Sequence, residues 1–406
     1  MDSAAAAIVE RIEQILDARP DLSQRGLAER AGLSSTQMNR IMTQQRKITA
    51  TELAIIAEAL EVPAAELLGQ SAQTLGVAAR VGRAERTPEL EGPFARAEKL
   101  LETRELLDRV MSRPEVDPRP VFALPTRGLE KDRGRAAAVA LREQLGVEPV
   151  EGIDDLVGLA GRFGLDVSTQ PLPANLHGLL VHGGRGVDPD DVTAVALVNS
   201  DDTYGRRRFT LAHELGHLVF GDGSLAIADY DRRAGGRDER WTEEALVELR
   251  ADLFAKNLLA PEAGVVAVVA EAGDRPAGQG PAAVWGAVLM ARVAARFEVS
   301  FEVAGYRLNE VGVFSDRERA AAEGYGATRA FEQAGLVEAG RALMDSAPEM
   351  LPPSALLAQA LEAYQAEELG LKPLATLYDL STPAQLENLR EQLRSAGWSP
   401  GSAVTG

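Results

Sequence analysis

The pentapeptide His213-Glu214-Leu215-Gly216-His217 sets the strictest requirement on local structure in this chain. On a helix, residues i and i+4 lie one turn apart on the same face, so both imidazoles can reach one metal ion. Glu214 then projects beside the metal, where it can accept a proton from water. We expect a helix over about 202–220 that ends at Gly221. Its apolar packing surface is expected to come from Leu211, Leu215, Leu218 and Val219.

Histidine is scarce in this chain and gathers around the motif. All four histidines (His177, His182, His213 and His217) fall within about one tenth of the 406 residues. His177 and His182 lie in or near a predicted strand, and two interpretations stay open. They line the cleft of the site, or they are structural or surface residues, which is the interpretation we favour. The chain has no cysteine, which excludes disulfides, thiolate nucleophiles and cysteine-ligated metal sites.

Two histidines alone make a weak metal site, so we looked for a third ligand in the next predicted helix, residues 242–259. Glu248 and Asp252 again sit at i and i+4. Glu248 fits the ligand role, and Asp252 fits an acceptor that orients a ligand histidine. Glu243 and Glu244 lie one turn away and are the alternatives. Two histidines, one carboxylate and an open position are the donor set of a catalytic zinc site, whereas the alternative is a buried histidine pair in an ordinary amphipathic helix.

Three stretches carry a resemblance to a known family. They are the string from Arg208 to His217, the string from Glu248 to Ala255 with the following Leu258, Leu259 and Pro261, and the segment 292–308. Through these stretches, residues 134–310 resemble the ImmA/IrrE family of metallo-endopeptidase domains. The resemblance implies a zincin-like fold and a zinc ion, with manganese as the alternative.

The same resemblance implies that His213, His217 and Glu248 bind the metal and that Glu214 is the general base of peptide-bond hydrolysis. Asp252 stands where these domains more often carry asparagine, and we expect it to keep the orienting role. Candidates for stabilising the oxyanion are His177, His182, Tyr204 and Tyr230.

The N-terminal residues predict a helix-turn-helix, with residues 23–34 forming the first helix and the turn. Ala28 is small where two helices cross closely, and Gly32 accepts the positive φ of a tight turn. In the next helix Met38 and Ile41 point inward. Polar side chains remain outside, where they can contact base edges or phosphates. The candidate DNA-contacting residues are Gln24, Ser35, Thr36, Gln37, Asn39 and Arg40.

Charge is distributed as DNA binding requires. Residues 1–70 hold 7 basic and 10 acidic residues, but residues 31–50 hold three basic residues and no acid. The segment from Leu27 to Leu68 resembles the Xre (phage-repressor-like) helix-turn-helix family over most of its length. This implies a double-stranded DNA operator as partner, bound sequence-specifically by a homodimer. The alternative is a small all-α domain that binds another protein.

The predicted fold class is mainly α with a small β-sheet (α+β). We expect an all-α helix-turn-helix bundle over 1–70, a helical and charged linker over 71–133, and a zincin-like α+β domain over 134–310. Its expected strands are 165–169, 178–182 and 192–198. Residues 311–406 predict a helical region without a motif, for which a dimerisation role, a sensor role and a plain solvated bundle are all open.

Composition bears on partners and location. The net charge is −18, from 43 basic and 61 acidic residues, which argues against non-specific coating of nucleic acid or an anionic membrane. No run of residues approaches the eighteen or so apolar positions of a membrane span. The N-terminal residues lack the pattern of a signal peptide. We therefore expect a soluble, cytoplasmic protein without a membrane partner.

These observations together predict a transcriptional regulator that binds an operator and cleaves a protein, such as a partner repressor. One alternative is a non-catalytic regulator whose metallopeptidase-like domain senses a ligand or binds a partner. A further alternative is the antidote of a toxin–antidote pair. The presence of Glu214 favours the enzyme, because a domain that only binds has no need of a general base.

Overall fold

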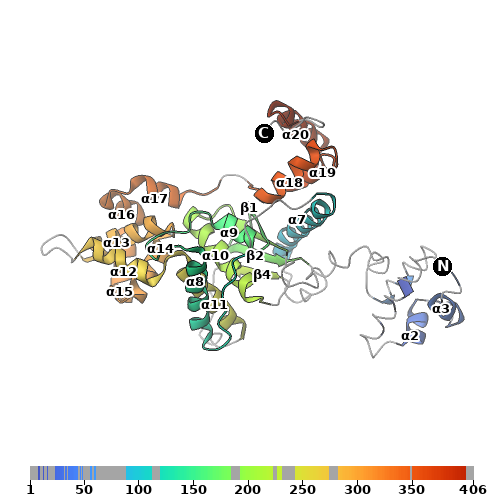
Figure 1. Ribbon diagram of the computed structural model, residues 1–406, viewed down its shortest axis with the longest axis horizontal. Helices are drawn as coiled ribbons and strands as arrows, with labels where there is room; N and C mark the ends of the chain where they lie inside the picture. Colours follow the sequence, from blue (N-terminus) through green and yellow to red (C-terminus); the bar gives the residue numbers. More distant parts are fainter. Residues whose placement is uncertain are drawn as a thin grey trace. The chain divides into compact units, whose positions relative to one another are not determined.

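The computed structural model describes residues 88–111, 119–183, 193–222, 226–230, 243–273, 282–347 and 350–398, together with part of residues 8–60 (Figure 1). The chain divides into two compact units, Met1–Arg83 and Ala84–Gly406. The sequence-based boundary at 133/134 falls inside a helix of the second unit, α8 (Glu130–Leu145). The four-domain division itself stays a prediction.

The first unit contains α2 (Gln24–Arg30) and α3 (Ser35–Met42). Ala28, Met38 and Ile41 are fully buried, as predicted, in a core that also contains Ile8, Val9, Ile12, Leu27, Ala31, Met42, Ile56 and Leu60. This apolar core covers one face of each helix and leaves polar side chains on the other. Gln24, Gln37, Asn39 and Arg40 are exposed. Gly32 and the side chains of Ser35 and Thr36 lie outside the described residues.

The second unit is built around a four-stranded mixed sheet of order β1-β3-β2-β4. Its strands are β1 (Leu165–Gln170), β2 (Leu176–His182), β3 (Ala194–Asn199) and β4 (Ala226–Tyr230). β1 and β3 are parallel, whereas β2 is antiparallel to both β3 and β4. With helices on both of its faces, this small sheet confirms the predicted α+β class. The first three strands were predicted from the sequence, but β4 was not.

Helices cover the sheet on both sides, which explains why all six residues of β3 are buried. One face packs against α10 (Tyr204–Phe220), and its inward side chains, such as Leu180 and Ala196, share a core with the leucines of that helix. The opposite face contacts α7 (Glu91–Val110). α7 therefore belongs to the peptidase-like unit, although its residues lie within the predicted linker.

Buried arginine contacts fix α7 to the edge strand β1. Arg104 forms a two-pronged ion pair with Asp166, in which the Arg104 Nε to Asp166 Oδ2 distance is 2.8 Å. Both residues are buried, so each charge is compensated by its partner rather than by water. Coulombic attraction and hydrogen bonding by Asp166 oppose the desolvation of the Arg104 guanidinium, and its pKa is raised.

Two close helix contacts fix the position of α11 (Glu243–Leu259), which passes between α8 and α10 (Figure 1). A Cβ at Gly134 of α8 would overlap the backbone carbonyl of Arg250 and lie 3.2 Å from the amide nitrogen of Phe254. A Cβ at Gly216 of α10 would lie 3.0 Å from the ring of Phe254 and 3.3 Å from the Cα atom of Ala251. Helix α11 is therefore held at backbone-to-backbone distance on both sides.

The remaining helices pack around one more central helix and around α7. The short helix α9 (Leu156–Arg162) packs against β1 and α10. The first group surrounds α13 (Ala282–Phe297) and consists of α12 (Glu262–Ala272), α14 (Phe301–Glu310), α15 (Asp316–Tyr325), α16 (Ala327–Ala334) and α17 (Val337–Met344). The short 3-10 helix Pro88–Leu90 precedes α7. The last group is α18 (Ser354–Gln365), α19 (Lys372–Leu377) and α20 (Pro383–Ser395), of which α18 and α19 contact α7. The helical character predicted for 311–406 is confirmed.

Backbone hydrogen bonds attach the chain between α17 and α18 to the outer edge of β1. Thr169 and Leu351 exchange two of them, at 2.9 and 2.8 Å. Nearby, the amide of Tyr204 donates to the carbonyl of Asp345 at 2.8 Å, where α10 begins. These bonds satisfy polar backbone groups that an edge strand would otherwise leave open.

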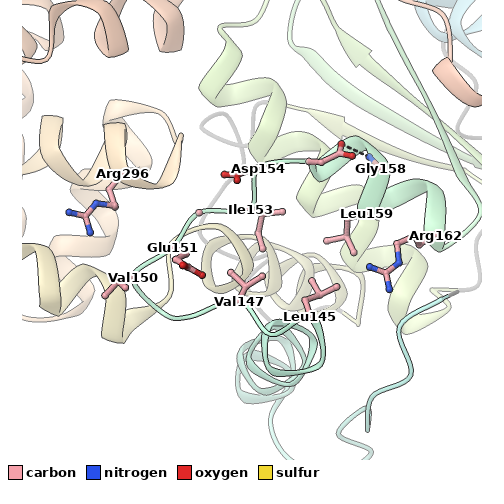
Figure 2. A pocket seen from close by; sticks show the side chains of 12 residues that line it. Leu145, Val147, Val150, Glu151, Ile153, Asp154, Gly158, Leu159, Arg162 and Arg296 are labelled. Carbon is pink, nitrogen blue, oxygen red and sulfur yellow. Dashed lines mark hydrogen bonds between the residues drawn. The ribbon is translucent and has the colours of Figure 1, made fainter. Parts of the chain in front are cut away.

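A cavity of about 900 Å³ opens beside the loop between α8 and α9 (Figure 2). The buried Arg142 holds this loop by donating hydrogen bonds to the carbonyl oxygens of Glu148 and Glu151, at 2.6 Å each. The charged lining residues are of both signs, so the cavity favours neither anions nor cations. They are Glu151, Asp154, Asp155, Arg162 and Arg296.

Among the described residues, no single helix is both long and apolar enough to cross a membrane. The helices Ala245–Leu259 and Glu262–Ala272 reach the required length and composition only when this bent pair is taken together.

We expect Gly134→Ala to destabilise the second unit by about 1–3 kcal/mol, because the added methyl group meets the backbone of α11. The matched control is Gly92→Ala in α7, where a Cβ meets nothing within 4 Å, and which should be neutral or stabilising. The three tryptophans of the chain, Trp241, Trp285 and Trp398, all belong to the second unit. Chemical unfolding followed by tryptophan fluorescence therefore measures the effect, and equal stability of the two variants would contradict the packing argument.

Candidate metal centre

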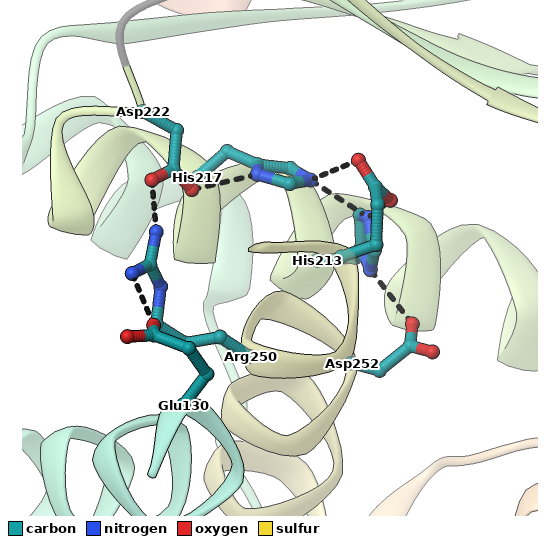
Figure 3. Close-up of polar contacts among 7 residues, drawn as sticks. Glu130, His213, His217, Asp222, Arg250 and Asp252 are labelled. Carbon is teal, nitrogen blue, oxygen red and sulfur yellow. Dashed lines mark hydrogen bonds and ion pairs between the residues drawn. The ribbon is translucent and has the colours of Figure 1, made fainter. Parts of the chain in front are cut away.

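Helices α10 and α11 bring three ligand-type side chains together at one point (Figure 3). The Nε2 atoms of His213 and His217 lie 2.9 Å apart. Glu248 approaches both rings, with one oxygen 3.3 Å from His213 Nε2 and the other 3.5 Å from His217 Nε2. The sequence-predicted trio therefore converges, with ligand atoms that all lie within 4.8 Å of one another.

A second carboxylate holds each imidazole from behind. His213 Nδ1 lies 2.9 Å from Asp252 Oδ1, and His217 Nδ1 lies 2.9 Å from Asp222 Oδ2 (Figure 3). Because a carboxylate accepts hydrogen bonds, each Nδ1 carries the proton and each neutral ring presents an unprotonated Nε2 to the centre. This arrangement fixes both the tautomer and the orientation of the two rings.

The donor set fits a divalent cation. Two imidazole lone pairs and a carboxylate converge in a buried place, with His213 1% and His217 0% exposed, and such a group of acceptors repels itself unless a cation lies among them. Ligand atoms about 2.1 Å from a tetrahedral zinc ion lie about 3.4 Å apart. His213 Nε2 lies 2.9 Å from His217 Nε2 and 3.3 Å from Glu248 Oε2, and the other Glu248 oxygen lies 3.5 Å from His217 Nε2, so either carboxylate oxygen can approach an ion held between the two rings.

Burial favours the form of His217 that binds metal. Desolvation lowers the pKa of its imidazole below the ordinary value, although the hydrogen bond with Asp222 acts in the opposite direction. The ring is therefore neutral near pH 7, and a neutral imidazole has the lone pair that coordination needs.

Asp222 was not singled out in the sequence, and the structure shows why it lies beside His217. Gly221 ends α10 in the left-handed conformation, with φ 63°, so the chain turns back on the helix. The amide of Asp222 then donates to the carbonyl of His217 at 3.1 Å. A carboxylate directly after the terminal glycine of a His-Glu-x-x-His helix is the signal that would have identified it.

An ion-pair chain continues from Asp222 into the neighbouring helices. The Oδ1 atom of Asp222, the oxygen that does not face His217, pairs with Arg250 of α11. Arg250 also pairs with Glu130 of α8 (Figure 3). The guanidinium stacks on the ring of Phe220, 4.3 Å from the ring centroid. Arg250 lies two residues after Glu248, so the same contacts that neutralise the half-buried Asp222 also fix the helix that carries Glu248.

Glu214 is fully buried against strand β2. A Cβ at Gly178 would lie 2.7 Å from Glu214 Oε1 and 2.6 Å from the methyl group of Thr210. Glycine at 178 is therefore required for the carboxylate to occupy its place. The sequence signal was a glycine inside a predicted strand, which marks a close approach of another group.

The other sequence candidates lie outside this cluster of contacts. His177 Nδ1 is 2.8 Å from Asp202 Oδ2 and 3.3 Å from Arg206 Nε, at the start of α10. His182 is half-buried at the end of β2. Tyr204 begins α10, with the guanidinium groups of Arg207 and Arg208 each 5.8 Å from the centroid of its ring. The side chains of Tyr230, Glu243 and Glu244 lie outside the described residues.

Comparison with known proteins agrees with this geometry. Residues 161–309 match the family model of the IrrE N-terminal-like domain, and residues 12–67 match a helix-turn-helix model. Residues 161–309 are an IrrE N-terminal-like domain. Both resemblances predicted from the sequence are thereby confirmed, and both matches lie within the predicted ranges 134–310 and 1–70.

A curated protein is similar to part of this chain. The chain is 33% identical over 165 residues to the radiation response metalloprotease IrrE of Deinococcus radiodurans. The aligned part is 40% of this chain and 42% of the relative. The chain thus spans about two fifths of that protein's length.

We expect Asp222→Asn to lower zinc affinity about 10- to 100-fold, because the amide cannot hold His217 and Arg250 as the carboxylate does. His217→Ala should lose the stoichiometric ion altogether. The control is Asp201→Asn, an exposed aspartate near the start of α10, which should bind zinc like the wild type. Competition with a chromophoric chelator measures all three affinities, and wild-type affinity in Asp222→Asn would contradict the orienting role.

Proposed function

We propose that this chain is a DNA-binding transcriptional regulator and a zinc-dependent metallo-endopeptidase that hydrolyses a peptide bond in a protein partner. A helix-turn-helix domain and an IrrE-like metallopeptidase domain in one chain support this. The observation that carries the enzymatic part is the convergence of His213, His217 and Glu248 beside the buried carboxylate of Glu214. His213, His217 and Glu248 would hold zinc, or manganese as the alternative.

Each residue of the proposed site has a distinct task. When bound, the metal ion supplies Lewis acidity, which polarises the scissile carbonyl and lowers the pKa of water. Glu214 accepts the proton of the attacking water and transfers it to the leaving amine. Asp252 and Asp222 keep the two histidine rings in place, and Gly178 leaves room for the Glu214 carboxylate.

DNA binding is proposed for the exposed face of α3. Gln37, Asn39 and Arg40 project from the side of the helix opposite to Met38 and Ile41, and Gln24 is exposed on α2. This is how a recognition helix presents polar side chains to a major groove. We propose an operator as the target, a homodimer as the binding form, a repressor as the protein substrate and the cytoplasm as the location.

The alternative functions differ from the proposed one in whether they need a proton acceptor at Glu214. A ligand sensor, a partner-binding domain or an antidote would use the fold and the metal site without needing a proton acceptor beside them. The carboxylate of Glu214 is completely buried against Gly178, and an apolar residue would fill this place at lower cost in desolvation. This favours turnover.

We expect Glu214→Gln to abolish peptide hydrolysis while the variant keeps its zinc and its fold, because the change is nearly isosteric and removes only the proton acceptor. Gly178→Ala should lower hydrolysis for a different reason, since its methyl group displaces the Glu214 carboxylate. Cleavage of the products of neighbouring genes, with elemental analysis of each variant, is the measurement. Wild-type activity in Glu214→Gln would remove this residue from the mechanism and favour the sensor function.

Arg40→Ala should weaken operator binding, because Arg40 is exposed on α3. A loss of about 1–3 kcal/mol confined to particular sequences indicates a base contact, whereas a uniform loss, with a salt dependence reduced by about one, indicates a phosphate contact. Arg341→Ala removes an exposed charge from the second unit and serves as the matched control, together with Glu214→Gln. A gel-shift titration on genomic fragments measures affinity. If neither the chain nor residues 1–70 bind any fragment, the first unit is an interaction domain.

A further inference from the structure

Far along the chain from the metal ligands, the last three helices surround a hollow of about 490 Å³. Its lining side chains come from α18, α19, α20 and the residues that follow α19 and α20. Figure 1 shows where these three helices lie in the fold. Nine of its twelve lining side chains are apolar or aromatic, three are amides and none is charged. Its volume falls within the range of pockets that hold small molecules, and it is far larger than the voids of a well-packed interior.

One face of α20 is directed entirely at this hollow. The lining positions on and just after the helix are 385, 388, 389, 392, 393 and 396, which follow the helical repeat. Leu389 and Leu393 are the buried residues of α20, and both line the hollow. The charged residues of the helix, such as the Glu387–Arg390 ion pair, do not line it. The apolar face of α20 therefore forms one wall of this space, and its charged face lies outside it.

The lining also restricts the chemistry of an occupant. A charged molecule would lose its hydration without meeting an opposite charge, which is costly. Leu357 and Leu361 of α18 and Leu374 of α19 provide an apolar wall, whereas the amides of Asn388 and Gln392 lie along α20. An occupant with an apolar body and uncharged hydrogen-bonding groups on one side matches this division.

We propose that the hollow among α18, α19 and α20 is a binding site for an uncharged, mainly apolar small molecule. The site is independent of the metal centre and of the proposed hydrolysis.

The wall of the hollow is joined to the sheet of the metallopeptidase-like unit. The buried Arg96 of α7 donates hydrogen bonds to the carbonyls of Thr376 and Leu377 in α19, at 2.7 Å for Leu377, and to Gln170 of β1 at 3.2 Å. The next residue, Tyr378, lines the hollow. An occupant that moves α19 would therefore act on β1 through one arginine side chain.

The test uses the full chain and the neutral fluorescent probe N-phenyl-1-naphthylamine. Trp398 lines the hollow, whereas Trp285 lies on α13 and does not line it. We expect saturable binding of one probe per chain, with energy transfer from tryptophan to the bound probe that falls in Trp398→Phe when both proteins are compared at saturation. Glu214→Gln should bind the probe like the wild type, which separates this site from the metal centre.

A matched pair of variants tests the location. Leu361→Glu places a charge in the wall and should weaken probe binding by about ten-fold or more. Leu386→Glu changes an equally half-buried leucine of α20 that does not line the hollow, and should bind normally. The proposal is overturned if the wild type shows no saturable binding, if the two variants bind alike, or if Trp398→Phe leaves energy transfer unchanged. It is also overturned if the wild type ignores the probe and light scattering shows a dimer that Leu361→Glu dissociates, because a second copy then fills the hollow.

Discussion

Two hydrogen bonds, from the Nδ1 atoms of His213 and His217 to carboxylates, determine where the second unit can bind a metal ion. They turn the Nε2 atoms of His213 and His217 toward each other at 2.9 Å. Two such lone pairs repel each other unless a cation binds between them, and the two rings must be held rigidly to keep them facing. The surrounding structure supplies that rigidity, because α11 is fixed between Gly134 of α8 and Gly216 of α10 and carries Glu248 to the same point.

Relations that depend on local periodicity could be predicted from the sequence. The i and i+4 spacings place His213 with His217 and Glu248 with Asp252, and the structure brings all four together. In the first unit, the same periodicity assigned Ala28, Met38 and Ile41 to the interior. A helix repeats every 3.6 residues wherever it packs, so its inward and outward faces follow from the chain alone.

Relations between distant segments could not be predicted in this way. β4 has five residues and forms a strand by pairing with β2, whose register no local pattern reveals. The partners of Arg250 come from α8 and from the end of α10, 120 and 28 residues away. The role of Gly178 depends on the Glu214 side chain of another element. Each of these needs the fold before it can be inferred.

The position of α7 determines where this protein can be cut into stable pieces. The match to the IrrE N-terminal-like domain begins at residue 161, yet the face of the sheet opposite to α10 is covered by residues 91–110. A recombinant fragment that starts at 134 would expose Leu179, Val181, Val195 and Leu197 to water and deprive Asp166 of its ion-pair partner Arg104. Exposed apolar strands of this kind aggregate. The boundary between the two units, after Arg83, therefore lies before α7, and α7 belongs to the unit that contains the IrrE N-terminal-like match.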